Sequence, residues 1–148
     1  MIKIEEVRIG NLVKTNQGVF KIFELESTSP KLCLITFLSK ETHWRDIKDV
    51  SPIKFDSDWS LKLGFQQEGT EAGDDGAMEL GNSAMEKDLT FLWIPKAGRY
   101  MDKDSVGLWI NRDYGNEQCK IDIKRAKYVH QIQNIYFSLK GKELKYTL

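Results

Sequence analysis

Residues 1–55 alternate between short apolar runs and turn-forming residues, a pattern typical of a small antiparallel sheet. Gly18 and Pro30 lie between apolar runs, where turns are expected. The pattern predicts five strands, at residues 12–14, 19–25, 32–38, 42–45 and 50–53. Short strands spaced so closely indicate a curled sheet that resembles an SH3-like small β-barrel, because closing a sheet removes its exposed edges.

A short helix and a second group of strands are predicted after residue 55. Ser57 is the expected N-cap of the helix, and Gly64 is expected to end it in a left-handed conformation. Three later apolar runs should form an antiparallel meander, since the links between them are short. These strands are predicted at residues 89–94, 106–110 and 119–123.

The C-terminal helix is the best-defined element of the pattern. From about residue 126 to residue 139, apolar side chains recur at helical spacing, and Gly141 is expected to end the helix. Residues 144–148 offer a last short strand. The predicted class is therefore α+β, with an N-terminal SH3-like barrel, a short linking helix, an antiparallel β-meander and a C-terminal amphipathic helix. The apolar stripe of the last helix consists of Tyr128, Val129, Ile132, Ile135, Tyr136 and Leu139.

Residues 66–88 lack periodicity and are rich in glycine and acidic side chains. Too few apolar groups are present to offset the entropy of ordering, so we expect a mobile surface loop with at most a poor hairpin. Asp74, Asp75 and Glu79 lack the alternating spacing of a calcium-binding loop. The sequence contains no zinc-ligand spacing, phosphate-binding loop or serine-nucleophile motif, so we assign no metal, no cofactor and no catalytic residue.

The composition fits one globular domain of 148 residues, of which 41% are apolar and 30% charged. We expect a single domain with an SH3-like part at 1–55 and the remaining elements at 56–148. Lysine plus arginine equals aspartate plus glutamate, 22 against 22, so the formal net charge is zero. A dedicated nucleic-acid-binding protein usually has a basic excess, because phosphate contacts supply most of its affinity. The balance disfavours that class but allows a local basic patch.

Cysteine usage and hydropathy favour a cytoplasmic protein. Cys33 and Cys119 lie in predicted strands, where they are interpreted as small buried residues rather than as a disulfide framework. The first residues are charged and lack the apolar region of a signal peptide. No apolar run approaches the ~18 residues of a membrane span, so no membrane association is expected.

Three stretches of the chain carry motifs. Residues 8–13 read RIGNLV, residues 59–65 read WSLKLGF, and the C-terminal region contains YVHQIQNIYF followed by GKEL. They resemble the RIGNLV, WLLKLGF and YVHQLQNLYFALTGEEL motifs of a family of small proteins from gut Bacteroidetes, their phages and their mobile elements. The acidic segment 66–88 and Lys140 depart from that pattern. The family has no established activity, so the resemblance implies a bacterial host cell and no particular chemistry.

The far side of the C-terminal helix carries His130, Gln133, Asn134 and Phe137, within about 100° of one another on a helical wheel. A solvated face would more often carry lysine and glutamate, so we expect this face to be covered. The N-terminal sheet or a loop is one possible cover, with His130 and Asn134 bonding to backbone groups. The alternative is a partner or dimer surface with Phe137 as its anchor. As a catalytic base, His130 lacks a nucleophile or carboxylate nearby in the sequence.

Two other groups of residues are candidate binding sites. The triplet at residues 43–45 places an aromatic ring between two potential cations, which would suit a base or a peptide unless the tryptophan is a core residue. A basic group near the start of the last helix would suit a phosphate or nucleic acid, unless it is simply a solvated face. The residues are His43, Trp44 and Arg45 in the triplet, and Lys120, Lys124, Arg125 and Lys127 in the basic group.

The leading hypothesis is a non-enzymatic protein-interaction or accessory module of phage or mobile-element origin. Its partner would be another protein or a second copy of the chain. The alternative is a weak nucleic-acid-binding protein that uses the basic group and the triplet. A third hypothesis is an enzyme centred on His130.

Overall fold

The computed structural model describes residues 2–26, 28–67, 78–80, 89–94, 105–111, 118–123 and 126–148. Contacts divide the chain into two compact units. Unit 1 comprises Met1–Lys54 and Tyr128–Leu144, and unit 2 comprises Phe55–Lys127 and Lys145–Leu148. The chain first passes from unit 1 to unit 2 after Lys54, and the C-terminal helix belongs to unit 1.

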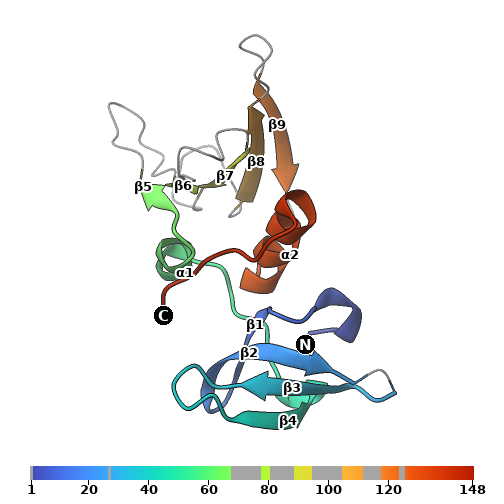
Figure 1. Ribbon diagram of the computed structural model, residues 1–148. Coiled ribbons are helices and arrows are strands. Elements are labelled where there is room, and N and C mark those ends of the chain that lie inside the picture. Colours follow the sequence, from blue (N-terminus) through green and yellow to red (C-terminus); the bar gives the residue numbers. More distant parts are fainter. Residues whose placement is uncertain are drawn as a thin grey trace. The chain divides into compact units, whose positions relative to one another are not determined.

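Unit 1 contains a four-stranded antiparallel sheet in the order β1-β2-β3-β4 (Figure 1). An α+β class and the first four expected strands are confirmed. β3 ends earlier than expected because the chain turns after it, where the N–H of Thr36 donates to the carbonyl oxygen of Glu41 at 3.0 Å. The strands are β1 (Leu12–Thr15), β2 (Gly18–Leu25), β3 (Lys31–Ile35) and β4 (Thr42–Asp46), and a single 3-10 turn, η1 (Ile4–Glu6), precedes them.

The fifth expected strand, at residues 50–53, is not formed. A second 3-10 turn, η2 (Ile47–Asp49), follows β4, and Ser51 then makes an isolated bridge to Lys14 of β1. Two backbone hydrogen bonds, of 3.0 and 2.8 Å, hold this bridge. Pairing does not extend to Ile53 and Leu12, the next residues that would bond to each other, because the N–H of Leu12 donates to Gln133 and the carbonyl oxygen of Ile53 accepts from the N–H of Val129 at 3.0 Å. The sheet is not closed, and the expected barrel is not confirmed.

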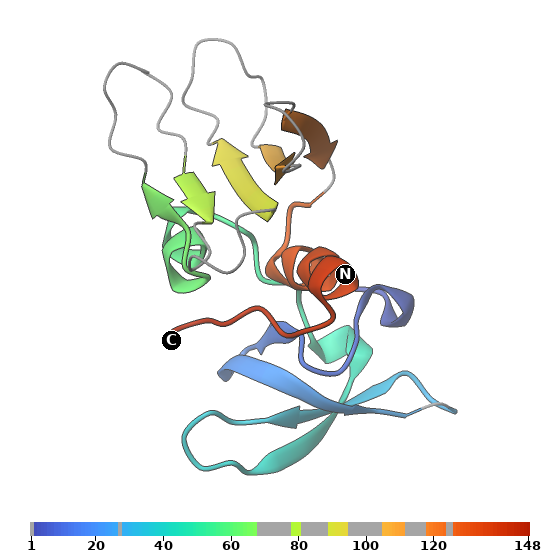
Figure 2. The same cartoon turned by 45° about the horizontal axis from the view of Figure 1, so that its top comes forward.

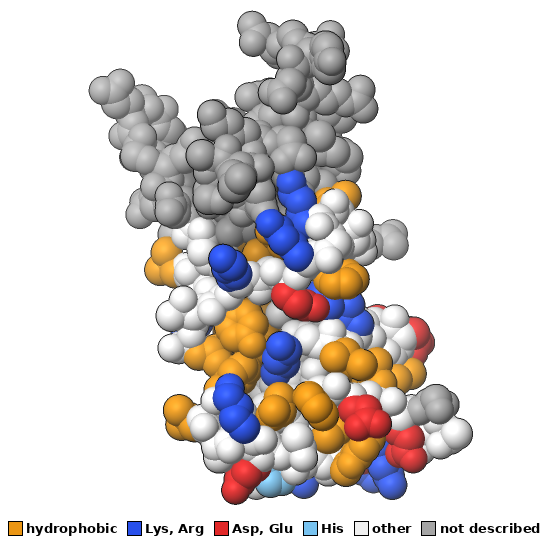
Figure 3. Space-filling view, in the orientation of Figure 1, with side chains coloured by type: hydrophobic (Ala, Val, Ile, Leu, Met, Phe, Trp, Pro, Cys, Tyr) orange, Lys and Arg blue, Asp and Glu red, His pale blue; other side chains and the backbone are white. Residues whose placement is uncertain are grey.

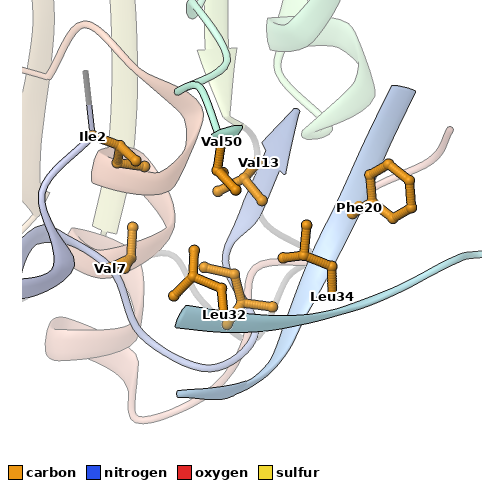
Figure 4. Close-up of a cluster of buried hydrophobic side chains, with 8 residues drawn as sticks. Ile2, Val7, Val13, Phe20, Leu32, Leu34 and Val50 are labelled. Carbon is orange, nitrogen blue, oxygen red and sulfur yellow. The ribbon is translucent and has the colours of Figure 1, made fainter. Parts of the chain in front are cut away.

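Alternate residues of the sheet form the core of unit 1, as the period of two predicts. Ile22 and Leu34 are cross-strand partners and both are buried, and Figure 4 shows the surrounding side chains converging. A β-bulge between Ile22 and Glu24 adds Phe23 to β2, and this ring is 53% exposed. The cluster consists of Ile2, Val7, Val13, Phe20, Ile22, Leu32, Leu34 and Val50.

The second helix, α2 (Val129–Lys140), begins about three residues later than expected. An antiparallel bridge between Lys54 and Tyr128 keeps the chain extended up to that point. Gly141 ends the helix with a φ of 67°, as predicted. Val129, Ile132 and Tyr136 of the expected apolar stripe are buried, whereas Leu139 is 47% exposed.

Unit 2 contains a five-stranded antiparallel sheet in the order β5-β6-β7-β8-β9. The expected meander of three strands is confirmed in β7, β8 and β9. β5 and β6 form a short hairpin within the segment expected to be a loop, whose residues 68–77 and 81–88 lie outside the described part of the chain. The strands are β5 (Gln66–Gln67), β6 (Met78–Leu80), β7 (Leu89–Ile94), β8 (Ser105–Asn111) and β9 (Gln118–Ile123).

The short helix α1 (Ser57–Lys62) also belongs to unit 2. Its N-cap is Asp56, one residue before the expected Ser57, because the Asp56 carboxylate accepts from the N–H of Trp59 at 3.0 Å. Gly64 has a φ of 81°, as expected for the residue that ends the helix. The last expected strand is not formed, and the N–H of Thr147 instead donates to the carbonyl oxygen of Lys62 at 2.8 Å. No helix in the described part of the chain is long and apolar enough to cross a membrane.

Candidate functional site

The far face of α2 is covered by the N-terminal segment of its own unit. The Gln133 side-chain oxygen accepts from the N–H of Leu12 at 2.8 Å. Asn134 accepts from the side chain of Asn11 at 2.9 Å and donates to the carbonyl oxygen of Glu6 at 2.9 Å. This face was expected to be covered either by the chain itself or by a partner, and in the structure the chain itself covers it.

His130 and Gln133 are fully buried, so neither side chain is available to a partner. Their expected place on a partner surface is therefore corrected. The physical reason lies in β1, an edge strand whose outward N–H groups need acceptors once helix α2 buries them. The side chains that satisfy backbone groups are Gln133 and Asn134, and His130 is not one of them.

Arg8 ties the end of α2 to the same segment. Its guanidinium forms a bidentate ion pair with Glu143, in which Nη2 lies 3.0 Å from Oε2, and it also donates to the carbonyl oxygen of Gln133 at 3.3 Å. The guanidinium carbon lies 4.0 Å from the centroid of the Phe137 ring, a cation–π contact. Phe137, the expected anchor, is thus only 37% exposed and has an intramolecular partner.

His130 does not have the surroundings of a catalytic base. Neither ring nitrogen has a hydrogen-bond partner, and the ring stacks on Tyr128 with centroids 5.8 Å apart. Burial lowers the pKa of His130, and the negative charge of Glu6 offsets part of that shift. A carboxylate or thiol that would orient the imidazole is not among its partners in the described residues.

Two of the three motif stretches meet in this contact. Arg8 and Asn11 belong to RIGNLV, Gln133 and Asn134 to YVHQIQNIYF, and Glu143 to GKEL. They are joined by the hydrogen bonds described above. Residues of these two stretches therefore hold α2 against the N-terminal segment of unit 1.

The triplet at residues 43–45 lies on β4, where successive side chains point to opposite faces. Trp44 is the cross-strand partner of Cys33 and is 47% exposed on the outer face. His43 and Arg45 are paired with the core residues Leu34 and Leu32, so both lie on the other face and are half-buried. The three side chains of the triplet therefore do not lie on one face of the sheet.

β4 is the free edge of the sheet in both views (Figure 1 and Figure 2). Hydrogen bonds from Thr36 to Glu41 and from Ile47 to Pro30 at the two ends of the β3–β4 ladder show which residues face β3. Because these bonds alternate along an antiparallel pair, His43 and Arg45 bond to β3. The N–H and C=O groups of the other three residues therefore point outward. These residues are Thr42, Trp44 and Asp46.

The two edge strands of this sheet differ in whether their outward backbone groups have hydrogen-bond partners. On β1, the outward N–H of Leu12 is bonded to Gln133, and both outward groups of Lys14 are bonded to Ser51. On β4, no backbone acceptor occurs in the described residues for the outward N–H groups of Thr42, Trp44 and Asp46. Since proteins normally cover or blunt a free edge, an open one beside an exposed tryptophan is the feature of unit 1 best suited to binding.

Comparison of the chain with known proteins was made at three levels: family models, curated sequences and solved structures. None of them matches. The candidate function is accordingly inferred from the open edge of β4.

The expected basic group falls largely outside the described residues. Lys124 and Arg125 lie there, and the side chain of Lys120 in β9 is likewise not described. Lys127 is exposed, two residues before α2 begins, so it does not occupy the first turn as expected. On the described part of the face in Figure 3, both signs of charge are interspersed with apolar side chains.

The thiol of Cys33, on the outer face of the sheet, does not have the surroundings of a reactive cysteine. Cys33, between its cross-strand partners Glu24 and Trp44, is only 4% exposed. Burial raises the pKa of the Cys33 thiol, and the charge of Glu24 raises it further, which disfavours the nucleophilic thiolate. Within the described residues, no group of three or more His, Cys, Asp or Glu side chains is placed to hold a metal ion.

Proposed function

We propose that this chain is a non-enzymatic protein-interaction module that binds an extended segment of a partner protein at the open edge of β4. One observation carries the proposal: Thr42, Trp44 and Asp46 direct their N–H groups away from the sheet, and within the described residues no backbone carbonyl accepts from them. A partner strand placed about 4.8 Å from β4 would complete those hydrogen bonds.

The exposed indole of Trp44 gives the edge an anchor. A partner strand presents every second side chain on the outer face, next to Trp44, which is 47% exposed. Large aromatic side chains contribute most to binding when a partner desolvates them. Backbone hydrogen bonds would therefore supply general affinity, and contacts with Trp44 would add selectivity.

The proposal also includes an SH3-like fold for unit 1 and a bacterial origin for the protein. An SH3-like curl of unit 1 is supported by the 3-10 turn η2 after β4 and by the bridge from Ser51 back to β1. The sequence motifs support an origin in phages or mobile elements of gut Bacteroidetes and a role in the bacterial cytoplasm. The nucleic-acid alternative is less favoured, because Trp44 and Arg45 lie on opposite faces of β4.

Amide hydrogen exchange of the full-length protein tests the proposed edge. In the free protein, the amides of Thr42, Trp44 and Asp46 should exchange fast, whereas those of His43 and Arg45 should be protected by β3. Addition of a short peptide in which valine and threonine alternate should protect the first three amides. An unchanged exchange pattern at saturating peptide would refute strand addition.

Thr42→Pro tests the same edge by removing one of its outward N–H groups. Proline is tolerated at the first residue of a strand when its nitrogen faces solvent, so the β3–β4 ladder should survive while one outward donor is lost. We expect peptide affinity to fall about fivefold or more, whereas Thr42→Ala should bind like the wild type. Equal binding by both variants, with unchanged circular dichroism, would contradict the proposal. A duplex or single-stranded oligonucleotide bound with steep salt dependence would favour the nucleic-acid alternative instead.

A further inference from the structure

We infer that the partner segment carries acidic side chains alternating with apolar ones. This inference rests on the proposed binding of a strand at β4. The two faces of the added strand would lie next to different side chains of β4. Trp44 lies on the outer face, and His43 and Arg45 lie on the other.

The guanidinium of Arg45 lies at the open edge itself. Its Nη1 is 3.5 Å from the carbonyl oxygen of Trp44, one of the outward-pointing acceptors, and its Nη2 donates to the side chain of Gln17 at 3.1 Å. Both partners are neutral, and Arg45 forms no ion pair within the described residues. An incoming strand thus meets an uncompensated positive charge beside its own backbone.

Lys48 already compensates the negative charge of Asp46, the acidic residue of β4. Asp46 forms an ion pair with Lys48 at 3.5 Å and accepts from the N–H of Lys48 at 3.1 Å. That backbone hydrogen bond is the main reason that the pKa of Asp46 is lowered. The charge left to be matched at the edge is therefore that of Arg45, and a carboxylate on the partner strand matches it.

Charge complementarity also argues against a second copy of this chain as the partner. The antiparallel register that pairs all of β4 with another β4 is centred on Trp44, and it places Arg45 opposite His43 twice. It also places Lys48 opposite Lys40. Arg45 would therefore have no carboxylate directly opposite it, and the like charges of Lys48 and Lys40 would repel, so a different, acidic segment fits the edge better.

Fluorescence anisotropy with three labelled peptides tests this chemistry on the full-length protein. Valine alternates with glutamate in the first peptide, with glutamine in the second and with lysine in the third. We expect the glutamate peptide to bind about fivefold more tightly than the glutamine peptide, and the lysine peptide to bind most weakly. Arg45→Gln should abolish the preference for glutamate. Lys14→Gln, which removes the same charge from an exposed side chain of β1, should preserve it.

The outcomes separate this inference from the proposed function. Equal binding of the glutamate and glutamine peptides, with both lost in Thr42→Pro, overturns the acidic preference and leaves strand addition standing. Failure of all three peptides to bind overturns the proposed function and this inference together. A wild-type dimer in light scattering that becomes a monomer in Thr42→Pro identifies a second copy as the occupant, which also overturns the acidic partner.

Discussion

His130 of α2 is buried without a hydrogen bond to either nitrogen of its ring within the described part of the chain. It is 0% exposed, and neither ring nitrogen has a hydrogen-bond partner in the described residues. A charged imidazole would therefore lose its hydration without gaining a hydrogen-bond acceptor, which is why burial lowers its pKa. The ring stacks on that of Tyr128, with the two planes inclined by 9°.

The free energy of unfolding should fall as His130 becomes able to take up a proton. Because its folded-state pKa lies below the ordinary value of 6.5, the unfolded chain binds the proton first. The stability contributed by the neutral ring is complete above about pH 6.5 and is lost as the pH falls below it. Urea unfolding from about pH 8 to about pH 5 gives the slope of the free energy of unfolding against pH. His130→Leu should reduce this slope. The control His43→Gln, at the other histidine, should leave the contribution of His130 in place. Equal slopes for wild type and His130→Leu would contradict this account.

Gly10 is required for two separable reasons. Its φ is 95°, a conformation that side-chain-bearing residues rarely adopt, and an added Cβ would lie 2.8 Å from the carboxylate oxygen of Glu143. Gly10→Ala should therefore destabilise the protein by about 2 kcal/mol in thermal or urea unfolding. Gly141→Ala, where φ is 67° and no atom lies within 4 Å of the added Cβ, isolates the backbone strain and should cost about 1 kcal/mol. A loss at Gly10 no greater than at Gly141 would mean that Glu143 moves aside freely.

At the scale of elements, the docking of α2 depends on one side chain that completes the edge of β1. Gln133→Leu keeps the volume of the side chain but leaves the buried N–H of Leu12 without an acceptor. We expect a loss of about 2 kcal/mol in urea unfolding, the cost of an unpaired buried donor. Gln131→Leu makes the same chemical change on the same helix, where the side chain bonds to the N–H of half-buried Tyr128 at 3.2 Å. It should cost less than about 1 kcal/mol, and equal losses would refute a special role for Gln133.

The elements themselves were largely predictable, since strand and helix patterns are local. Alternation located β1 to β4 and the meander β7 to β9, and helical spacing located α2. The errors occurred where a neighbouring segment decided the outcome. The bonding of Leu12 to Gln133 and of Ile53 to Val129 limited the fifth strand to a single bridge, and pairing of Tyr128 with Lys54 delayed the start of α2. The open edge of β4 was not predicted, because the direction of a strand's N–H groups depends on its register with β3.

At the scale of the whole molecule, unit 1 is built from two parts of the chain that are far apart in sequence. Residues 1–54 supply the sheet, and residues 128–144 supply the helix that covers the edge of β1. The fragment 1–54 should therefore lack a cooperative thermal transition in near-ultraviolet circular dichroism, because Leu12 and Asn11 would lose their partners. A synthetic peptide of residues 128–144, added in trans, should restore the transition. A stable, cooperatively folded fragment 1–54 would contradict the dependence on α2.

The sequence by itself determined the α+β class, most strand and helix positions and the glycine that ends each helix, because these depend on local periodicity and on backbone conformation. It also indicated that the far face of α2 is not solvated, since imidazole, amide and phenyl groups replace lysine and glutamate there. Tertiary structure alone decided what covers that face, as hydrogen bonds between residues more than a hundred positions apart cannot be derived from spacing. It also decided that Trp44 and Arg45 point to opposite faces and that, among the described strands, β4 pairs with β3 alone, because pairing and register are properties of the assembled sheet.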